Sequence, residues 1–173
     1  MSRYEVLQIW ERLLTQSALM HATWREFPSE VAFVSERASS SLRERQHATS
    51  LEGFALNVTN LLADLAKELL ILQSPQDFRH LKSMGAQEIL DLAFQDALPT
   101  PSERATLKDI RRGRDAMQHG YAFVAAEQSW HQIFLVVQKI GLYLDRLQQG
   151  FGAAGISLEM DYPEFPAPAE PTL

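Results

Sequence analysis

The sequence LEGFALNVTNLLADLAKELLILQ, residues 51–73, is the stretch that decides the fold. Its apolar residues recur at steps of three and four, which is the period of one face of an α-helix. The residues on this face are Leu51, Phe54, Val58, Leu61, Leu65, Leu69 and Leu72. Ser74-Pro75 follows at once, and proline disfavours a helical conformation in the residue before it. The stretch therefore predicts a helix of about six turns with one apolar seam to bury.

The residues before this stretch have the same helical period. Ser2 is a suitable N-cap for a first helix, and Phe27-Pro28 ends it. One face of that helix is formed by Val6, Trp10, Leu13, Ser17, Met20 and Trp24. A short helix is expected at residues 29–38. The polar residues 39–50 fit either a loop or an exposed extension of the helix that follows.

The chain after residue 74 contains three more helical patterns. Residues 78–84 are expected to form a connector, with a turn or helix cap at Gly85, before a short amphipathic helix. The apolar residues of that short helix are Ile89, Leu90, Ala93, Phe94 and Leu98. Ser102 is a suitable N-cap for the next helix, and Gly120 stands where an αL cap would end it. The last helix is expected at residues 126–149, with one face formed by Trp130, Phe134, Val137, Ile140, Leu144 and Leu147.

These segments together predict the fold class. No alternating strand pattern and no repeat of fixed period occurs in the sequence. We expect an all-α fold, an antiparallel helical bundle of four to five main helices with short connections. Residues 1–149 would form its single domain. Residues 150–173 are acidic and rich in proline, and we expect this tail to be disordered or loosely packed.

Composition narrows the classes of function. The 173 residues contain no cysteine, which excludes thiolate catalysis, disulfides and cysteine-based zinc sites. No apolar run is long enough to span a membrane, so we expect a cytoplasmic protein. The net charge of −6 argues against a protein that coats nucleic acid. Residues 101–115, however, hold five basic and three acidic residues, a net +2, which leaves −8 for the remainder.

The sequence RRGRDAMQHGY, residues 111–121, is the strongest candidate for a functional site. On a regular helix Arg112, Asp115 and His119 form one stripe, because they are separated by three and four residues. Arg114 is five residues before His119, about 140° around a regular helix. The sequence leaves open which of the two arginines is the closer partner of the histidine.

This combination of side chains suits cleavage of a phosphodiester without a metal ion. Histidine exchanges a proton near neutral pH, and a guanidinium group binds phosphate oxygens in two places at once. Asp115 would fix the tautomer of His119. The RNA backbone would lie against the preceding basic side chains, which are Arg104, Lys108, Arg111 and Arg112. The structural alternatives are a solvated basic helix face and a histidine that interacts with a helix C-terminus.

The motif resembles the signature of the HEPN superfamily, Arg-x4-6-His with a polar residue after the arginine. Arg114 and His119 have this spacing, and Asp115 is the polar residue. The extension to Tyr121 resembles the Arg-x4-His-x-Tyr form found in toxins of the HEPN–MNT pairs, whose partner is a minimal nucleotidyltransferase. The helices over residues 50–148 follow a similar order. The chain differs from compact toxins in its length, its region 39–50 and its acidic tail.

The resemblance implies a HEPN-like fold and an endoribonuclease, a toxin or phage-defence effector that needs no cofactor and no metal. Arg114 and His119 would be its catalytic pair, in the cleft of a homodimer. A nucleotidyltransferase antitoxin would modify Tyr121. The alternative is a non-catalytic HEPN-like helical dimer that binds a partner protein or a nucleotide.

The remaining polar residues give weaker signals. His21, His47, His80 and His131 have no spacing that suggests a metal site, and we interpret them as surface or half-buried histidines. Asn57 lies close to the apolar seam, where it would be a buried hydrogen-bonding residue or a group that supports the site.

Overall fold

The computed structural model describes residues 1–94 and 126–160, and all regular structure within these ranges is helical. The prediction of an all-α fold is therefore confirmed. The elements are α1 (Arg3–Glu26), α2 (Glu30–Arg37), α3 (Leu42–Gln73), the 3-10 helix η1 (Pro75–Asp77), α4 (Phe78–Ser83), α5 (Ala86–Phe94) and α7 (Ala126–Ala153). The expected motif helix at residues 102–119 lies outside the described residues, so the predicted HEPN-like arrangement stays a prediction.

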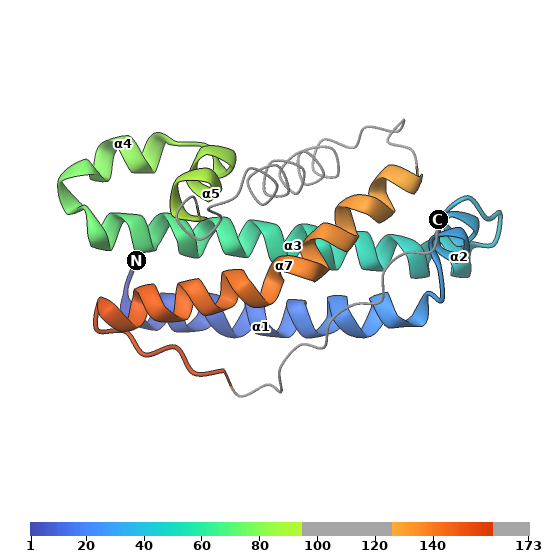
Figure 1. Ribbon diagram of the computed structural model, residues 1–173, viewed down its shortest axis with the longest axis horizontal. Helices are drawn as coiled ribbons and strands as arrows, with labels where there is room; N and C mark the ends of the chain where they lie inside the picture. Colours follow the sequence, from blue (N-terminus) through green and yellow to red (C-terminus); the bar gives the residue numbers. More distant parts are fainter. Residues whose placement is uncertain (95–125, 161–173) are drawn as a thin grey trace.

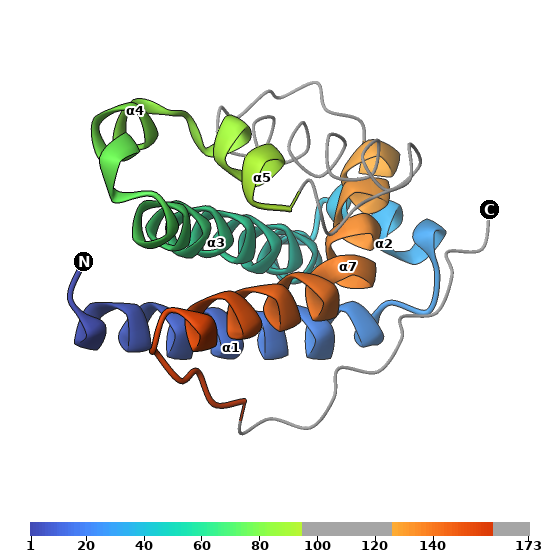
Figure 2. The same ribbon diagram turned by 60° about the vertical axis from the view of Figure 1, so that its left-hand side comes forward.

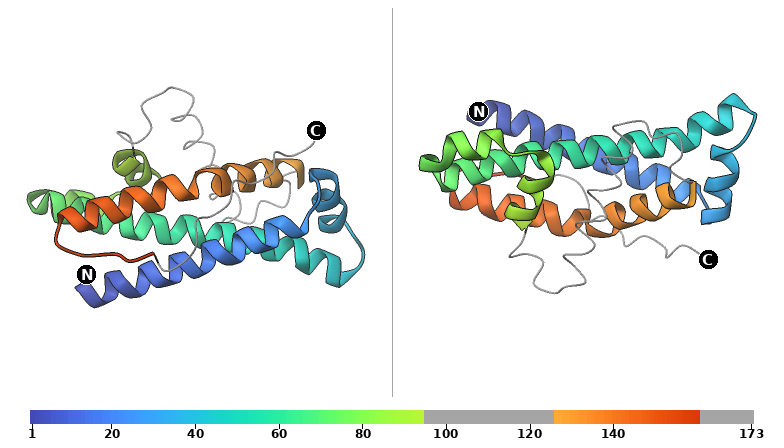
Figure 3. Two further views of the ribbon diagram at one scale, coloured as in Figure 1. Left: turned by 60° about the horizontal axis from the view of Figure 1, so that its bottom comes forward. Right: turned by 90° about the horizontal axis from the view of Figure 1, so that it is seen from above.

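The helix α3 is the centre of the fold. It packs against α1, α2, α4, α5 and α7. In Figure 1, α1 runs in the opposite direction to α3 and α7, which run in the same direction. Figure 2 shows α5 and α7 on either side of α3, and Figure 3 shows α2 and α4 at opposite ends of the molecule. Residues 51–73 thus form most of the surface on which the other helices assemble.

The helix α1 has the boundaries and the buried face expected from its sequence. Ser2 and Glu5 form a reciprocal capping box at its start, and Phe27 is its C-cap. Such a box satisfies amide groups that the first turn leaves without partners. The six positions of the predicted face are all buried, at most 4% exposed.

The seam of α3 is buried over most of the predicted length but not at its end. Leu51 and Leu65 are fully buried, Phe54 is half-buried and Leu72 is 39% exposed. Leu69 packs against Gly150 of α7, where an added Cβ would lie 2.5 Å from a Leu69 methyl carbon. The close approach of the two helices ends there, and Leu72 lies one turn further along α3.

Two segments are helical where the sequence left the choice open or favoured a connector. Residues 42–50 belong to α3, so the polar region is largely an extension of that helix. The expected connector at 78–84 is mostly helical, with η1 leading into α4. The Lys67 ammonium group donates hydrogen bonds to the carbonyls of Lys82 and Met84, at 3.1 and 3.0 Å. These bonds fasten the end of α4 to α3.

Residues 150–160 differ from the loose tail expected from Gly150 onward. The helix α7 continues to Ala153 and ends in a left-handed turn at Gly155, with the Ile156 amide bonded to the Phe151 carbonyl at 2.8 Å. Phe151 and Leu158 are buried. Burying these two side chains favours a folded segment, and Figure 3 shows it turning back beside α1. The rest of the tail, residues 161–173, lies outside the described residues.

Within the described ranges, no helix combines the length and the apolar character that a membrane span requires.

Candidate functional site

The predicted site lies outside the described residues. This applies to the proposed catalytic residues, to the proposed RNA-binding residues and to the proposed modification site. The residues concerned are Arg104, Lys108, Arg111, Arg112, Arg114, Asp115, His119 and Tyr121. The structure does describe the helices on either side, since α5 ends at Phe94 and α7 begins at Ala126. The described part of the chain also has hollows between its helices, and three of these are candidate sites of their own.

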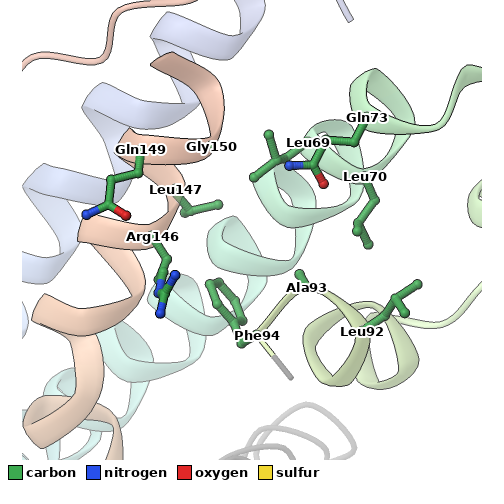
Figure 4. A pocket seen from close by; sticks show the side chains of 10 residues that line it. All are labelled: Leu69, Leu70, Gln73, Leu92, Ala93, Phe94, Arg146, Leu147, Gln149 and Gly150. Carbon is green, nitrogen blue, oxygen red and sulfur yellow. The ribbon is translucent and has the colours of Figure 1, made fainter. Parts of the chain in front are cut away.

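The first hollow lies between α3, α5 and α7 and has a volume of about 390 Å³. Figure 4 shows its lining, with leucine side chains and Phe94 forming apolar walls. Gln73, Arg146 and Gln149 supply the polar groups. Phe94 packs against Tyr143 of α7 with ring centroids 4.7 Å apart, and this contact holds the Phe94 ring in place in the wall of the hollow. Among the described residues that line the hollow there is no histidine and no carboxylate.

The second hollow lies between α1 and α3, with a volume of about 430 Å³. Asn57 lines it, is exposed, and donates a hydrogen bond from Nδ2 to Oε1 of Gln16 at 3.0 Å. Asn57 therefore makes a hydrogen bond as expected, but the expected burial is wrong, because the residue lies on the solvent side of the α1–α3 contact. There it links the two helices. Glu11 and Asp64 also line the hollow, and no histidine is found among its described lining residues.

The third hollow, which we call the His47 cavity, lies where the ends of α1 and α2 meet the start of α3. It has a volume of about 570 Å³. Its lining residues are Glu26, Glu36, Ser41, Arg43, Glu44 and His47. Arg43 and His47 are four residues apart on α3 and therefore lie on the same face. Of these three hollows, only the His47 cavity has an imidazole among its described lining residues.

The ring of His47 is held on both sides. Its Nε2 lies 2.5 Å from Oε2 of Glu26, and its Nδ1 lies 2.6 Å from Oε2 of Glu36. The ring of Phe27 stacks on it with centroids 4.4 Å apart. Burial lowers the pKa of His47, but the hydrogen bonds and charges of the two carboxylates outweigh burial and raise the pKa above its ordinary value. The sequence interpretation of a half-buried histidine fits, but it missed both glutamate partners.

Two other histidines of the described residues, His21 and His80, differ from His47. His21 is buried on α1, and burial, together with the positive charge of Arg25, lowers its pKa to about 4. His80 is exposed on α4. Within the described ranges, no group of three histidine, aspartate or glutamate side chains could hold a metal ion. In the His47 cavity the geometry explains this, since the two glutamates bind opposite nitrogens of one ring.

Comparison of the chain with protein-family models, with curated proteins and with solved structures finds no match.

Proposed function

We propose that this protein is a metal-independent endoribonuclease of the HEPN type, which acts in the cytoplasm as a toxin or defence effector. The observation that carries the proposal is the motif Arg114-x4-His119-x-Tyr121. Arg114 and His119 are the catalytic pair, and Asp115 orients the imidazole. The basic residues from Arg104 to Arg112 bind the RNA backbone.

The helices on either side of the motif support the proposal. A long apolar helix, α3, precedes it, and a second long helix, α7, begins five residues after Tyr121. This order is the one expected from the resemblance. The helical fold of the described residues is consistent with the proposed HEPN type, but it does not distinguish this type from other all-α folds of similar length. The weight therefore rests on the motif.

The proposed reaction is an attack by the ribose 2′-hydroxyl on the adjacent phosphorus atom. The 2′ oxygen forms a bond to phosphorus, and the bond from phosphorus to the 5′ oxygen of the next nucleotide breaks. The products are a 2′,3′-cyclic phosphate and a free 5′-hydroxyl. The reaction removes one proton from the 2′ oxygen and supplies one to the leaving oxygen, so it needs a base and an acid. Two histidines in a homodimer cleft would supply both, and Arg114 would stabilise the charge on the phosphorane.

Substitution of the proposed catalytic pair tests this proposal. We expect His119→Ala and Arg114→Ala each to reduce the rate of RNA cleavage by at least about 100-fold, the lower range for general acid–base catalysis. His80→Ala and Arg79→Ala are matched controls, because both residues are exposed on α4, and their cleavage rates should equal that of the wild type. Circular dichroism should show the same helical content for all variants. A folded His119→Ala variant with the wild-type rate would exclude the proposal.

The net charge of −6 favours a second candidate, a non-catalytic helical dimer that binds a protein partner. Salt distinguishes the two functions. Binding of RNA through several phosphate contacts weakens steeply as salt is added, because condensed counterions are released. An affinity for RNA that does not change between 50 and 200 mM salt, roughly the range over which such binding loses several orders of magnitude, would favour the second candidate.

A further inference from the structure

We propose that His47 is a proton-operated latch, which holds the C-terminal ends of α1 and α2 against the start of α3 when protonated and releases α2 when neutral. This inference rests on the His47 cavity alone and does not depend on the proposed nuclease activity.

The first argument is the number of hydrogen atoms on the ring. Carboxylates accept hydrogen bonds and cannot donate them, so both bonds to His47 require an N–H group on the histidine. Only the imidazolium form has two N–H groups. A neutral ring would present a lone pair to Glu26 or to Glu36, and one of the two bonds would become a repulsion. The observed pair of contacts therefore belongs to the protonated state.

The second argument is the position of the two carboxylates. Glu26 is the last residue of α1, and Glu36 is the penultimate residue of α2. A negative side chain is unfavourable at a helix C-terminus, where the backbone carbonyls already carry partial negative charge. A positive ring between the two glutamates offsets this cost at both helix ends. When the ring loses its proton, the two glutamates and the two helix ends face one another without a cation between them.

The other charged groups at the cavity do not take over this role. From α3 itself, Arg43 and Glu44 line the cavity and carry opposite charges, so together they add no net charge. Arg43 opposes the proton on His47 and Glu44 favours it. From α1 and α2 the facing groups are Glu26 and Glu36. His47 is thus the group whose charge changes near neutral pH and decides the balance.

The helix α2 also makes contacts that do not involve His47, and these limit how far α2 moves when the histidine is neutral. Arg37 pairs with Glu52 of α3 through a hydrogen-bonded ion pair, and Phe33 is fully buried with its ring edge against Phe27. These contacts contain no histidine. Loss of the proton therefore loosens α2 without unfolding the protein. Since α2 also packs against α7, the loosening reaches the helix that follows the Arg-x4-His motif.

The direction of the pH effect follows from the proton count. The open form has the ordinary histidine pKa of about 6.5, and the closed form has a higher one. The latch is fully effective below about 6.5, and its contribution is lost as the pH rises through the pKa of the closed form. Each pH unit between the two pKa values multiplies the opening equilibrium of α2 by about ten.

Two measurements on the full chain test the latch together. NMR titration gives the midpoint of His47, and hydrogen exchange gives protection factors for the amides of α2 on both sides of that midpoint. We expect the titration midpoint of His47 to lie above about 6.5. Above that midpoint the protection factors of the α2 amides should be lower, by about tenfold for each pH unit that separates the midpoint from 6.5. Glu36→Gln should lower the midpoint, and His47→Gln should leave α2 protection low and independent of pH.

Glu44→Gln is the matched control, because Glu44 lines the same cavity but makes no hydrogen bond to His47. It should lower the midpoint less than Glu36→Gln does, because it removes a favourable charge but no hydrogen bond to the ring. Circular dichroism checks that each variant is folded, and the wild-type titration remains decisive if a variant is not. A wild-type midpoint at or below about 6.5, or α2 protection that is unchanged across it, would overturn the proposal.

Discussion

Leu65 and Leu72 belong to the same apolar seam in the sequence, but the structure predicts that their side chains contribute different amounts to the free energy of unfolding. Leu65 is fully buried in the C-terminal half of α3, whereas Leu72 is 39% exposed in the last turn. Truncation of a buried leucine to alanine removes its burial energy and leaves a cavity, and costs about 2–5 kcal/mol. Leu72→Ala leaves no enclosed cavity and removes only part of a side-chain burial energy of about 1.5–3 kcal/mol, so it should cost about 1 kcal/mol. Leucine and alanine are both good helix formers, so a change in helix propensity does not explain a difference between the two variants.

Thermal unfolding followed by circular dichroism measures this difference. For a chain of this size, 1 kcal/mol corresponds to a change in Tm of roughly 2–4 °C. We expect Leu65→Ala to lower the Tm by about 5–15 °C and Leu72→Ala by less than about 4 °C. Urea unfolding should give the same order. Equal losses of Tm in the two variants would refute the account of α3 as a helix whose buried seam ends at Leu69.

Three more predictions concern a helix cap, a docked segment and a buried histidine. Ser2→Ala removes a side-chain capping bond and should lower the stability measured in thermal melts by about 1 kcal/mol. Ser41→Ala is the control, because Ser41 makes no side-chain capping bond. Equal losses of stability in the two variants would contradict this prediction. Trp10→Phe removes the hydrogen bond of 2.8 Å from Nε1 to the Glu159 carbonyl. It should lower the Tm by about 2–4 °C and speed proteolysis after residue 153, and an unchanged digestion rate would argue against a docked segment. His21 has a pKa lowered to about 4, so the wild-type stability should fall as the pH drops from about 6.5 towards 4. In urea titrations at pH 5 and 7 His21→Leu should reduce that fall, and an identical fall in the variant would count against it.

The sequence predicted best those elements whose burial follows a helical period. The face of α1 is complete because the capping box at Ser2 and the stop at Phe27-Pro28 are local signals. The apolar pattern of α3 continues one turn beyond the buried seam, to Leu72, because periodicity shows only which side of a helix is apolar. It does not record where a neighbouring helix ends.

The polar residues 39–50 were ambiguous because tertiary contacts help to hold their helix in place. His47 binds Glu26 and Glu36, which come from two other helices. Arg37 and Glu52 form a second link between α2 and α3. Partners 11 to 21 residues away in the sequence leave no periodic signal, so neither the helix nor the histidine cavity could be derived from local pattern.

The segment at 150–160 was missed for a related reason. Its proline-rich, acidic continuation dominates the composition and hides Phe151, which continues the helical period of Leu144 and Leu147 in α7. Leu158 lies beyond the helix and follows no helical or strand period. The bond from Trp10 to Glu159 joins residues 149 positions apart. For the candidate site, the sequence supplied the motif at 111–121, and its residues stay a prediction because they lie outside the described ranges.

The products of RNA cleavage test the central claim most directly. A short RNA incubated with the protein in the presence of EDTA can be followed by 31P NMR, which separates a five-membered cyclic phosphate from a phosphate monoester. The account predicts a 2′,3′-cyclic phosphate and a free 5′-hydroxyl in EDTA, and neither product with His119→Ala. Cleavage that yields a 5′-phosphate, or cleavage that EDTA abolishes, would contradict the account.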